Sequence, residues 1–369
     1  MMKKMLLCPL GIMMALSLAA CSNTPQTAAT TAPASTAESS SQSGGEMSKT
    51  ADSASQSAEG AAGEDPAGKT AAEEPGASQT PDTVTVTTLN GSDEAMDIQV
   101  PYNPSRVAVL DMAVLDMLDN WDLGGRVVGM PKSSSIDYLM DYNNNEDIAN
   151  LGTLKEVDME ALMSSEPEII FIGGRLSAQY DALSKIAPVV YLSNNYEIGI
   201  LQSMKNNVSS IASIFGVQDK AAAQIAGFDQ RIAALAAAAE GKTAVIGMVT
   251  SSNFNSLGDG SRCSLIGNEI GFKNLANNVD STHGNESSFE LLVDLNPDYI
   301  FVLDRDSAIN TEGAKLANEI MDNELVHKTA ASQSGNIIYL TPTVWYLAEG
   351  GITAMDIMLQ DLETGLLDR

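Results

Sequence analysis

Three arginine residues stand at positions that are typical of a ligand site in an α/β protein. Arg175 and Arg305 each follow a predicted strand, and Arg262 follows a turn at residues 258–261, where a helix is expected to begin. The guanidinium group is planar, and its donors suit anions that carry several oxygens. The whole chain has a net charge of −28, so a cluster of arginines would select an anionic ligand. The sequence therefore predicts an anion-binding site.

An internal repeat relates two of these arginines. Residues 166–178 align without gaps on residues 296–308, so that Arg175 corresponds to Arg305. Ligands of open α/β sheets bind beyond the carboxyl ends of the strands. We therefore expect the two arginines on opposite sides of a cleft between two similar lobes. The alternative is that two βα units merely share apolar strands after Pro-Glu or Pro-Asp turns, which explains the paired arginines less well.

Short β-branched runs alternate with helical stretches from residue 83 onward, which is typical of an α/β protein. Four predicted strands precede a long helical stretch, from about Ile200 to Ala239, and three follow it. This stretch is interrupted near Phe215, and we expect Asp219 to cap its second part and Gly241 to end it. The predicted strands are Arg106–Leu110, Val127–Met130, Ile169–Gly173, Val189–Leu192, Thr243–Val249, Tyr299–Leu303 and Ile337–Leu340.

The simplest architecture is two α/β lobes joined by one long helix. The predicted boundaries are an N-terminal lobe over residues 83–198, a helical connection over 199–241 and a C-terminal lobe over 242–369.

The N-terminal residues resemble the leader of a bacterial lipoprotein. Two lysines precede an apolar run that ends in the lipobox-like sequence Leu18-Ala-Ala-Cys21, which implies a signal peptide over residues 1–20. The resemblance implies lipidation of Cys21 and anchoring to the outer face of the cytoplasmic membrane. An ordinary secretory signal followed by a stray cysteine is the alternative. Residues 22–82 contain no Val, Ile, Leu, Phe, Tyr or Trp, so residues 21–82 are predicted to be a disordered acidic tether.

Composition excludes several classes of function. With 20 Lys and Arg against 48 Asp and Glu, a nucleic-acid partner is not expected. Two histidines and three cysteines are too few for a His-rich metal site or a Cys₄ zinc site. The sequence has neither a G-x-S-x-G elbow nor a Walker A motif, so we do not expect an enzyme.

Seven stretches of the folded part resemble, in order, the solute-binding proteins of ABC importers for ferric siderophores, most closely those for ferric catecholates of the petrobactin type. The stretches are 106–116, 152–156, 172–175, 260–262, 282–290, 302–305 and 345–347. The resemblance implies the class III periplasmic-binding-protein fold, in which two Rossmann-like lobes are bridged by one helix. It implies no permanently bound cofactor, the ferric siderophore being the transported ligand.

The resemblance also implies the roles of individual residues. The three arginines are expected to face the ferric siderophore. His283 and Tyr346 are expected to ligate Fe(III) where the siderophore leaves positions open, and Trp345 to contact the ligand beside them. Fe(III) is a hard cation suited to phenolate oxygen and tolerant of imidazole. A structural role for His283 and a core position for Tyr346 are the alternatives.

Two glutamates at equivalent places in the repeat resemble the residues that dock on the permease. These are Glu160 and Glu290, one in each predicted lobe. The alternative for Glu290 is a capping box that begins at Ser287. The expected partners are thus a ferric siderophore, an ABC permease in the cytoplasmic membrane and the membrane itself through the lipid anchor, with the protein a monomer. A haem- or cobalamin-binding protein of the same transporter class and an exported Rossmann-like enzyme are the rival functions.

Overall fold

A computed structural model describes residues 81–277, 283–286 and 288–367. The predicted signal peptide, Cys21 and almost all of the predicted tether lie outside these residues. The described residues belong to one compact unit, so domain boundaries at residues 198 and 241 stay a prediction. Within the described residues, no helix is both long and apolar enough to cross a membrane.

The N-terminal sheet is parallel throughout, with the strand order β5-β4-β3-β6-β7. Its central strands are completely buried, as expected for parallel strands that are covered on both faces. The strands are β3 (Val107–Leu110), β4 (Val127–Met130), β5 (Ala149–Asn150), β6 (Ile169–Ile172) and β7 (Val189–Tyr191).

The C-terminal sheet has the order β11-β9-β8-β12-β13, with β10 also paired to β8. Its strands β10, β8, β12 and β13 are parallel, whereas β9 and β11 join antiparallel. The strands are β8 (Thr243–Thr250), β9 (Asn253–Ser256), β10 (Lys273–Asn274), β11 (Asn285–Glu286), β12 (Tyr299–Asp304) and β13 (Ile337–Leu340). All seven predicted strands are therefore confirmed, four in the first sheet and three in the second, while β5 and the short strands β9, β10 and β11 were not predicted.

An antiparallel hairpin that was not predicted precedes the first sheet. Its strands are β1 (Thr83–Leu89) and β2 (Ala95–Pro101). The hairpin is fixed to the edge strand β7, because the Thr88 hydroxyl donates to the backbone oxygen of Tyr191 (3.0 Å) and accepts from its N–H (2.7 Å). The otherwise open edge of the sheet is thereby partly covered.

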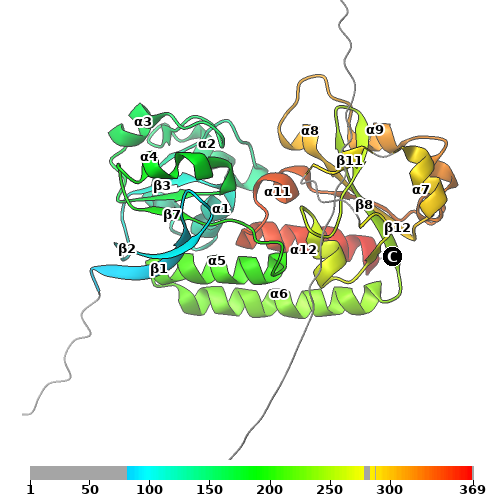
Figure 1. Cartoon of the computed structure of the whole chain (residues 1–369), viewed down its shortest axis with the longest axis horizontal. Helices are drawn as coiled ribbons and strands as arrows, with labels where there is room; N and C mark the ends of the chain where they lie inside the picture. The colour runs from blue at the N-terminus through cyan, green and yellow to red at the C-terminus, as the bar shows by residue number, and fades with distance from the viewer. Residues whose placement is uncertain (1–80, 278–282, 287, 368–369) are drawn as a thin grey trace, which may run out of the picture. The chain divides into compact units, whose positions relative to one another are not determined.

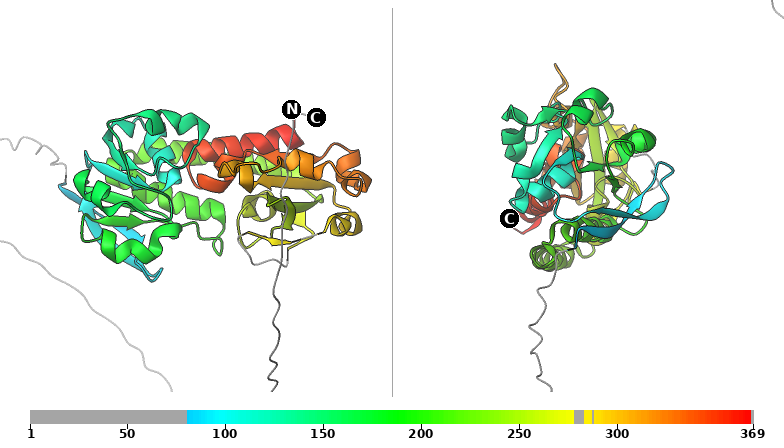
Figure 2. Two further views of the ribbon diagram at one scale, coloured as in Figure 1. Left: turned by 90° about the horizontal axis from the view of Figure 1, so that it is seen from above. Right: turned by 90° about the vertical axis from the view of Figure 1, so that its left-hand side faces the viewer.

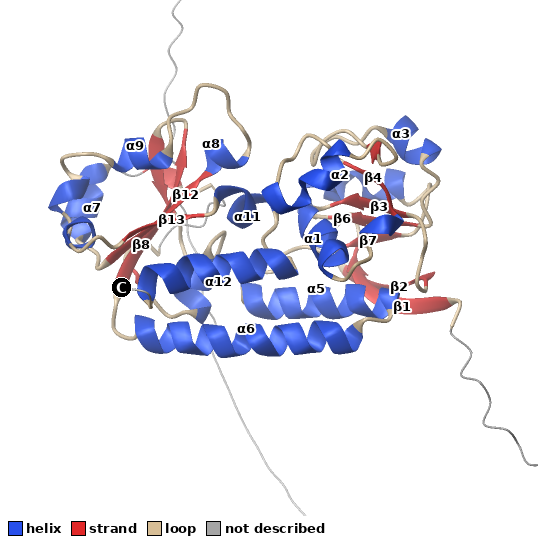
Figure 3. Cartoon of the chain, turned by 180° about the vertical axis from the view of Figure 1, so that it is seen from behind, coloured by secondary structure: helices blue, strands red, loops and turns tan. Residues whose placement is uncertain are grey.

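Twelve helices surround the sheets in the described part of the chain (Figures 1 and 3). Those before the connection are α1 (Met112–Asn120), α2 (Met140–Asn144), α3 (Met159–Ser164) and α4 (Tyr180–Leu183). The connection contains α5 (Ile200–Phe215) and α6 (Gln218–Ala239). Those that follow are α7 (Phe289–Leu295), α8 (Arg305–Ala308), α9 (Ala317–Met321), α10 (Ala330–Gln333), α11 (Pro342–Leu347) and α12 (Ile352–Leu366).

The long helix α6 runs beneath both sheets, and α5 and α12 lie above it (Figure 1). Helix α5 ends at Gly216, whose left-handed backbone (φ 70°) suits glycine. The prediction that Asp219 caps α6 is wrong. The helix begins at Gln218 without a side-chain cap, so Asp219 already lies in its first turn. Its predicted end is confirmed, since Ala239 is the last helical residue and Gly241 has a φ of 75°.

The C-terminal helix α12 is tied to the N-terminal part of the chain by one buried carboxylate. Asp116 of α1 accepts from the N–H groups of Thr353 (2.9 Å) and Ala354 (2.8 Å), which open α12, and from the hydroxyl of Tyr138 (2.5 Å). Gly351 permits this approach, because a Cβ there would lie 2.6 Å from the carboxyl carbon of Asp116. A residue 237 positions away in the sequence therefore caps the last helix.

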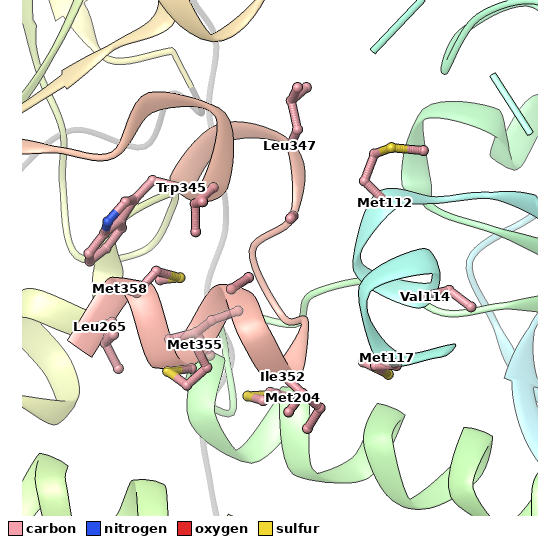
Figure 4. Close-up of a cluster of buried hydrophobic side chains, with 14 of the residues drawn as sticks. Met112, Val114, Met117, Met204, Leu265, Trp345, Leu347, Ile352, Met355 and Met358 are labelled. Atoms are coloured by element: carbon pink, nitrogen blue, oxygen red, sulfur yellow. The ribbon is translucent and has the colours of Figure 1, made fainter. Parts of the chain in front are cut away.

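One continuous hydrophobic core extends from the first sheet through these helices to the second sheet. Methionines are prominent where α1, α5 and α12 meet (Figure 4). Met117, Met204 and Met355 are almost completely buried there. Figure 2 shows α12, drawn in red, beginning near the N-terminal half and running along the C-terminal half, and the helix contacts both α1 and β13. The two halves are thus joined through packed side chains as well as through the chain connection.

Candidate functional site

The three predicted arginines lie at the carboxyl ends of strands or in the turn that follows them. Arg175 belongs to a 3₁₀ helix (Gly174–Gln179) directly after β6, and Arg305 is the first residue of α8, directly after β12. Arg262 lies in the turn between β9 and a short π-helical segment (Leu265–Glu269). The repeat therefore corresponds to two equivalent strand ends, one in each sheet.

All three guanidinium groups surround the ring of Tyr346, which lies in α11 after β13. Their central carbons are 4.4 Å (Arg262), 5.7 Å (Arg305) and 5.8 Å (Arg175) from the ring centroid. These distances are typical of cation–π contacts. Arg175 belongs to the N-terminal sheet region and the other two belong to the C-terminal one, so both halves contribute cations to one place.

Hydrogen bonds hold the cluster together. Arg175 Nη2 and Arg262 Nη1 donate to the backbone oxygen of Tyr346 at 3.3 and 3.0 Å. The phenol oxygen of Tyr346 accepts from Arg305 Nε at 3.1 Å and lies 3.3 Å from Nε2 of His283. The phenol thus stands between an imidazole and a guanidinium group.

A cavity of about 450 Å³ opens beside this cluster. Of the six residues predicted to contact a ligand, four line it: Arg175, Arg262, His283 and Tyr346. Arg305 does not line it. It lies behind Tyr346, where its guanidinium also contacts Thr250 Oγ1 (3.1 Å) and Asp306 Oδ1 (3.5 Å).

The predicted ligand contact of Trp345 is wrong. The side chain is completely buried, and its indole N–H donates to Asp361 Oδ2 at 2.8 Å. Its ring points away from α1 into the packed core (Figure 4). Neighbouring residues of a helix point in different directions, so Trp345 enters the core while Tyr346 borders the cavity.

Several residues that line the cavity were not predicted. Lys155 contributes a further cation, and Asp111 and Glu349 contribute carboxylates. The only sequence signal for Lys155 is its place in the stretch 152–156 that resembles the siderophore-binding family. The cavity is therefore lined by three cations (Lys155, Arg175 and Arg262) and two carboxylates, with Arg305 close behind.

The two carboxylates are engaged with the protein. Asp111 caps α1 by accepting from the N–H of Ala113 at 3.0 Å. Burial raises the pKa of Asp111, and the charge of Arg175 opposes this shift. Glu349 is buried, and its Oε2 accepts from the Tyr196 hydroxyl at 2.6 Å. Burial and the carboxylate of Glu349 raise the pKa of Tyr196, so this phenol remains a donor and the carboxylate is bound internally.

His283 lies in a positive environment. Partial burial, and then the charges of Arg305 and Arg262, lower the pKa of His283. The neutral imidazole is thereby favoured at pH 7, and this is the form that ligates metal ions. The side chain is accordingly in the protonation state that the iron-ligand hypothesis requires.

The two glutamates expected at the permease interface are exposed at equivalent positions. Glu160 lies in the first turn of α3, whose N-cap is Asp158, and Glu290 lies in the first turn of α7, whose N-cap is Ser288. The capping-box alternative for Glu290 is wrong. Because the cap is Ser288 rather than Ser287, Glu290 is the second helical residue and not the third, which a capping box uses.

Two known proteins are similar to this chain in sequence over most of its length. The petrobactin-binding protein YclQ of Bacillus subtilis is 34% identical over 271 residues, which are 73% of this chain and 84% of that protein. The ferric-anguibactin-binding protein FatB of Vibrio anguillarum is 29% identical over 276 residues, 72% of this chain and 84% of that protein.

Solved structures of siderophore-binding proteins are also similar to this chain. The crystal structure of YclQ matches with a TM-score of 0.72 and 32% identity, and the match covers 78% of this chain and 100% of that chain. The catecholate-siderophore binding protein VctP of Vibrio cholerae matches with a TM-score of 0.70 and 28% identity, over 76% of this chain and 100% of that chain. These matches identify the class III fold.

A family model described as periplasmic binding protein matches residues 107–344. Its members are extracytoplasmic substrate-binding proteins, not enzymes. With both sheets and the whole connection inside the matched range, this chain belongs to the periplasmic binding protein family.

Proposed function

We propose that this protein captures a ferric siderophore of the catecholate type and delivers it to an ABC permease for iron uptake. The observation that carries the proposal is the convergence of Arg175, Arg262, Arg305 and His283 on Tyr346 at the wall of one cavity. The relatives support it, since YclQ is a petrobactin-binding protein and VctP a catecholate-siderophore binding protein.

The charge of the cavity fits such a ligand. A ferric catecholate complex carries up to about three negative charges on closely spaced oxygens, which planar guanidinium groups bind well. Arg175 and Arg262 line the cavity with Lys155. In a protein with a net charge of −28, this patch would attract an anionic complex that the rest of the surface repels.

Tyr346 and His283 would complete the iron shell when the siderophore leaves positions open. Phenol oxygen and neutral imidazole are both suitable Fe(III) ligands, and their donor atoms are 3.3 Å apart. Arg305 would act through the phenol, since its Nε donates to the oxygen of Tyr346 while Arg305 itself does not line the cavity.

The transported complex leaves chemically unchanged, so delivery depends on docking rather than on catalysis. We assign docking on the permease to Glu160 and Glu290, because both are exposed at the same position of helices related by the repeat. We further infer that a lipid on Cys21 anchors a monomeric protein to the outer face of the cytoplasmic membrane.

Titration by fluorescence quenching tests the ligand class. The purified protein is titrated with ferric catecholate complexes, a ferric hydroxamate, haem and cobalamin, while the absorption spectrum is recorded. Ferric catecholates are expected to quench fluorescence at the lowest concentrations and to show their charge-transfer band. Preferential binding of haem or cobalamin would overturn the proposal.

A further inference from the structure

A second and larger cavity, of about 1000 Å³, adjoins the first. Gly174, Asn194 and Tyr196 line both, so the two spaces are neighbouring compartments of one cleft. The second compartment is bordered by the tip of the β1–β2 hairpin, by the loop after β7 and by one face of α5. In Figure 1, β1 lies between β7 and α5.

The two compartments differ in charge. The first is lined by three cations and by two carboxylates that are engaged with the protein, whereas no described residue that lines the second is lysine, arginine or histidine. Its charged groups are the carboxylates of Asp93 and Glu197. Amides and hydroxyls supply most of the remaining polar lining, among them Asn195, Asn206 and Ser210. An anion would thus find donors but no compensating charge, while an ammonium or amide N–H would find acceptors.

Internal hydrogen bonds preform the walls of the second compartment. The hydroxyl of Tyr191 donates to Asp93 Oδ1 at 2.6 Å, which fixes the hairpin tip against β7. Asn207 Nδ2 donates to the backbone oxygen of Ser193 at 3.2 Å and joins α5 to the loop after β7. Because these contacts join groups of the protein itself, a ligand group that enters pays little for ordering the walls.

We propose that the second compartment binds an uncharged or cationic arm of the siderophore, one that bears amide or amine groups. The iron-bound catecholates then occupy the first compartment, which is lined by Arg175 and Arg262 and is called the arginine compartment. This inference rests on the proposed function. It narrows the substrate class to catecholates with an arm that carries amide or amine N–H groups and no carboxylate. A single cleft would then bind the iron centre through positive charge and the organic arm through carboxylates and amides.

Three synthetic ferric catecholates with identical iron-binding groups test the assignment. The first has no arm, the second has a flexible aminoalkyl arm, and the third has an arm of the same length that ends in a carboxylate. We expect the amine arm to lower Kd by about tenfold or more relative to the ligand without an arm, and the carboxylate arm to give no such gain. Equal Kd values for the three ligands would overturn the inference.

Variants that add a charge test whether the arm lies in the second compartment. Asn206→Lys places a cation in the second compartment at an exposed position of α5, and it should abolish the gain from the amine arm while leaving the ligand without an arm unaffected. Gln230→Lys adds the same charge at an exposed position of α6 that does not line the cavity, and it should change neither affinity. A retained gain in Asn206→Lys would refute the location.

A neutralising variant provides a second readout. Glu197→Gln should reduce the gain from the amine arm several-fold at low salt and have no effect on the ligand without an arm. Failure of the unaltered protein to bind any of the three ferric complexes would instead refute the proposed function itself. Tight binding of the ligand without an arm, together with no effect of either arm, would leave the proposed function intact and refute only the second compartment.

Discussion

Replacing Arg175 by alanine should weaken the binding of ferric catecholates without destabilising the protein. Its side chain is exposed and lines the cavity, and its hydrogen bond to the backbone oxygen of Tyr346 is long at 3.3 Å. Truncating one partner of a fully desolvated charge pair costs about 2–5 kcal/mol, whereas an exposed ion pair contributes about 0–1 kcal/mol. The cost of truncating Arg175 should lie between these limits, because a ligand in the cavity would cover part of its side chain.

We therefore expect Arg175→Ala to lose about 1–3 kcal/mol of binding free energy, which is roughly a 5- to 150-fold increase in Kd. Arg305→Ala should have a smaller direct effect, because Arg305 does not line the cavity and already contacts Thr250 and Asp306. The assay is fluorescence-quench titration at two salt concentrations, since a charge contact should weaken as salt rises. Lys185→Ala removes a cation from an exposed site outside the cavity and serves as the control.

Two results would refute this reasoning. If Arg175→Ala and Lys185→Ala bound equally well, the arginine compartment would not attract the ligand through Arg175. If Arg175→Ala lost affinity only in parallel with its melting temperature, the effect would be structural.

The structure leads to three further predictions. Tyr346→Phe removes the phenol oxygen that contacts Arg305 and His283. A tetradentate ferric catecholate should then bind about tenfold more weakly and show a shifted charge-transfer band, while a hexadentate one should bind nearly as before. Equal effects on both complexes would exclude Tyr346 as an iron ligand. Glu160→Ala with Glu290→Ala should leave binding unchanged and abolish iron uptake by cells, and normal uptake would contradict the docking assignment. Burial raises the pKa of Asp116 to about 6 from its ordinary value of 3.8. The folded state therefore binds this proton more tightly than the unfolded state does. As the pH falls from about 6 to 4, protonation of this group should increase the free energy of unfolding by up to about 3 kcal/mol. Chemical denaturation of the unaltered protein and of Asp116→Asn over this range isolates that contribution, and parallel pH profiles would contradict it.

Strand positions could be predicted because they depend on local patterns. Apolar runs such as Ile169–Ile172 and Tyr299–Asp304 are buried on both faces, and such runs are visible in the sequence without knowledge of their neighbours. The hairpin was missed even though Thr83–Leu89 alternates in burial and Asn90-Gly91 follows it, a typical hairpin signal. Its place beside β7, which creates a wall of the second compartment, depends on contacts that no local pattern contains.

The residues that line the first cavity were predictable to the extent that they follow strands or were singled out within stretches that resemble the family. Arg175, Arg262, His283 and Tyr346 all reach the cavity. Lys155 and Glu349 were missed because each is a single polar residue in a loop, and loops carry no periodicity from which the direction of a side chain can be inferred. For Lys155, its place in the stretch 152–156 was a signal that was not used.

The sequence by itself determined the α/β class, the two groups of strands and the paired arginines, because these depend on residue periodicity and on a repeat along the chain. Only the tertiary structure decided that Trp345 enters the core while Tyr346 borders the cavity, that Arg305 lies behind the phenol, and that two compartments of different charge adjoin. Asp116 illustrates the physical reason, since its partners Thr353 and Ala354 are 237 and 238 residues away. The direction of a side chain is set by the packing of distant segments, and that packing appears only when the chain is folded.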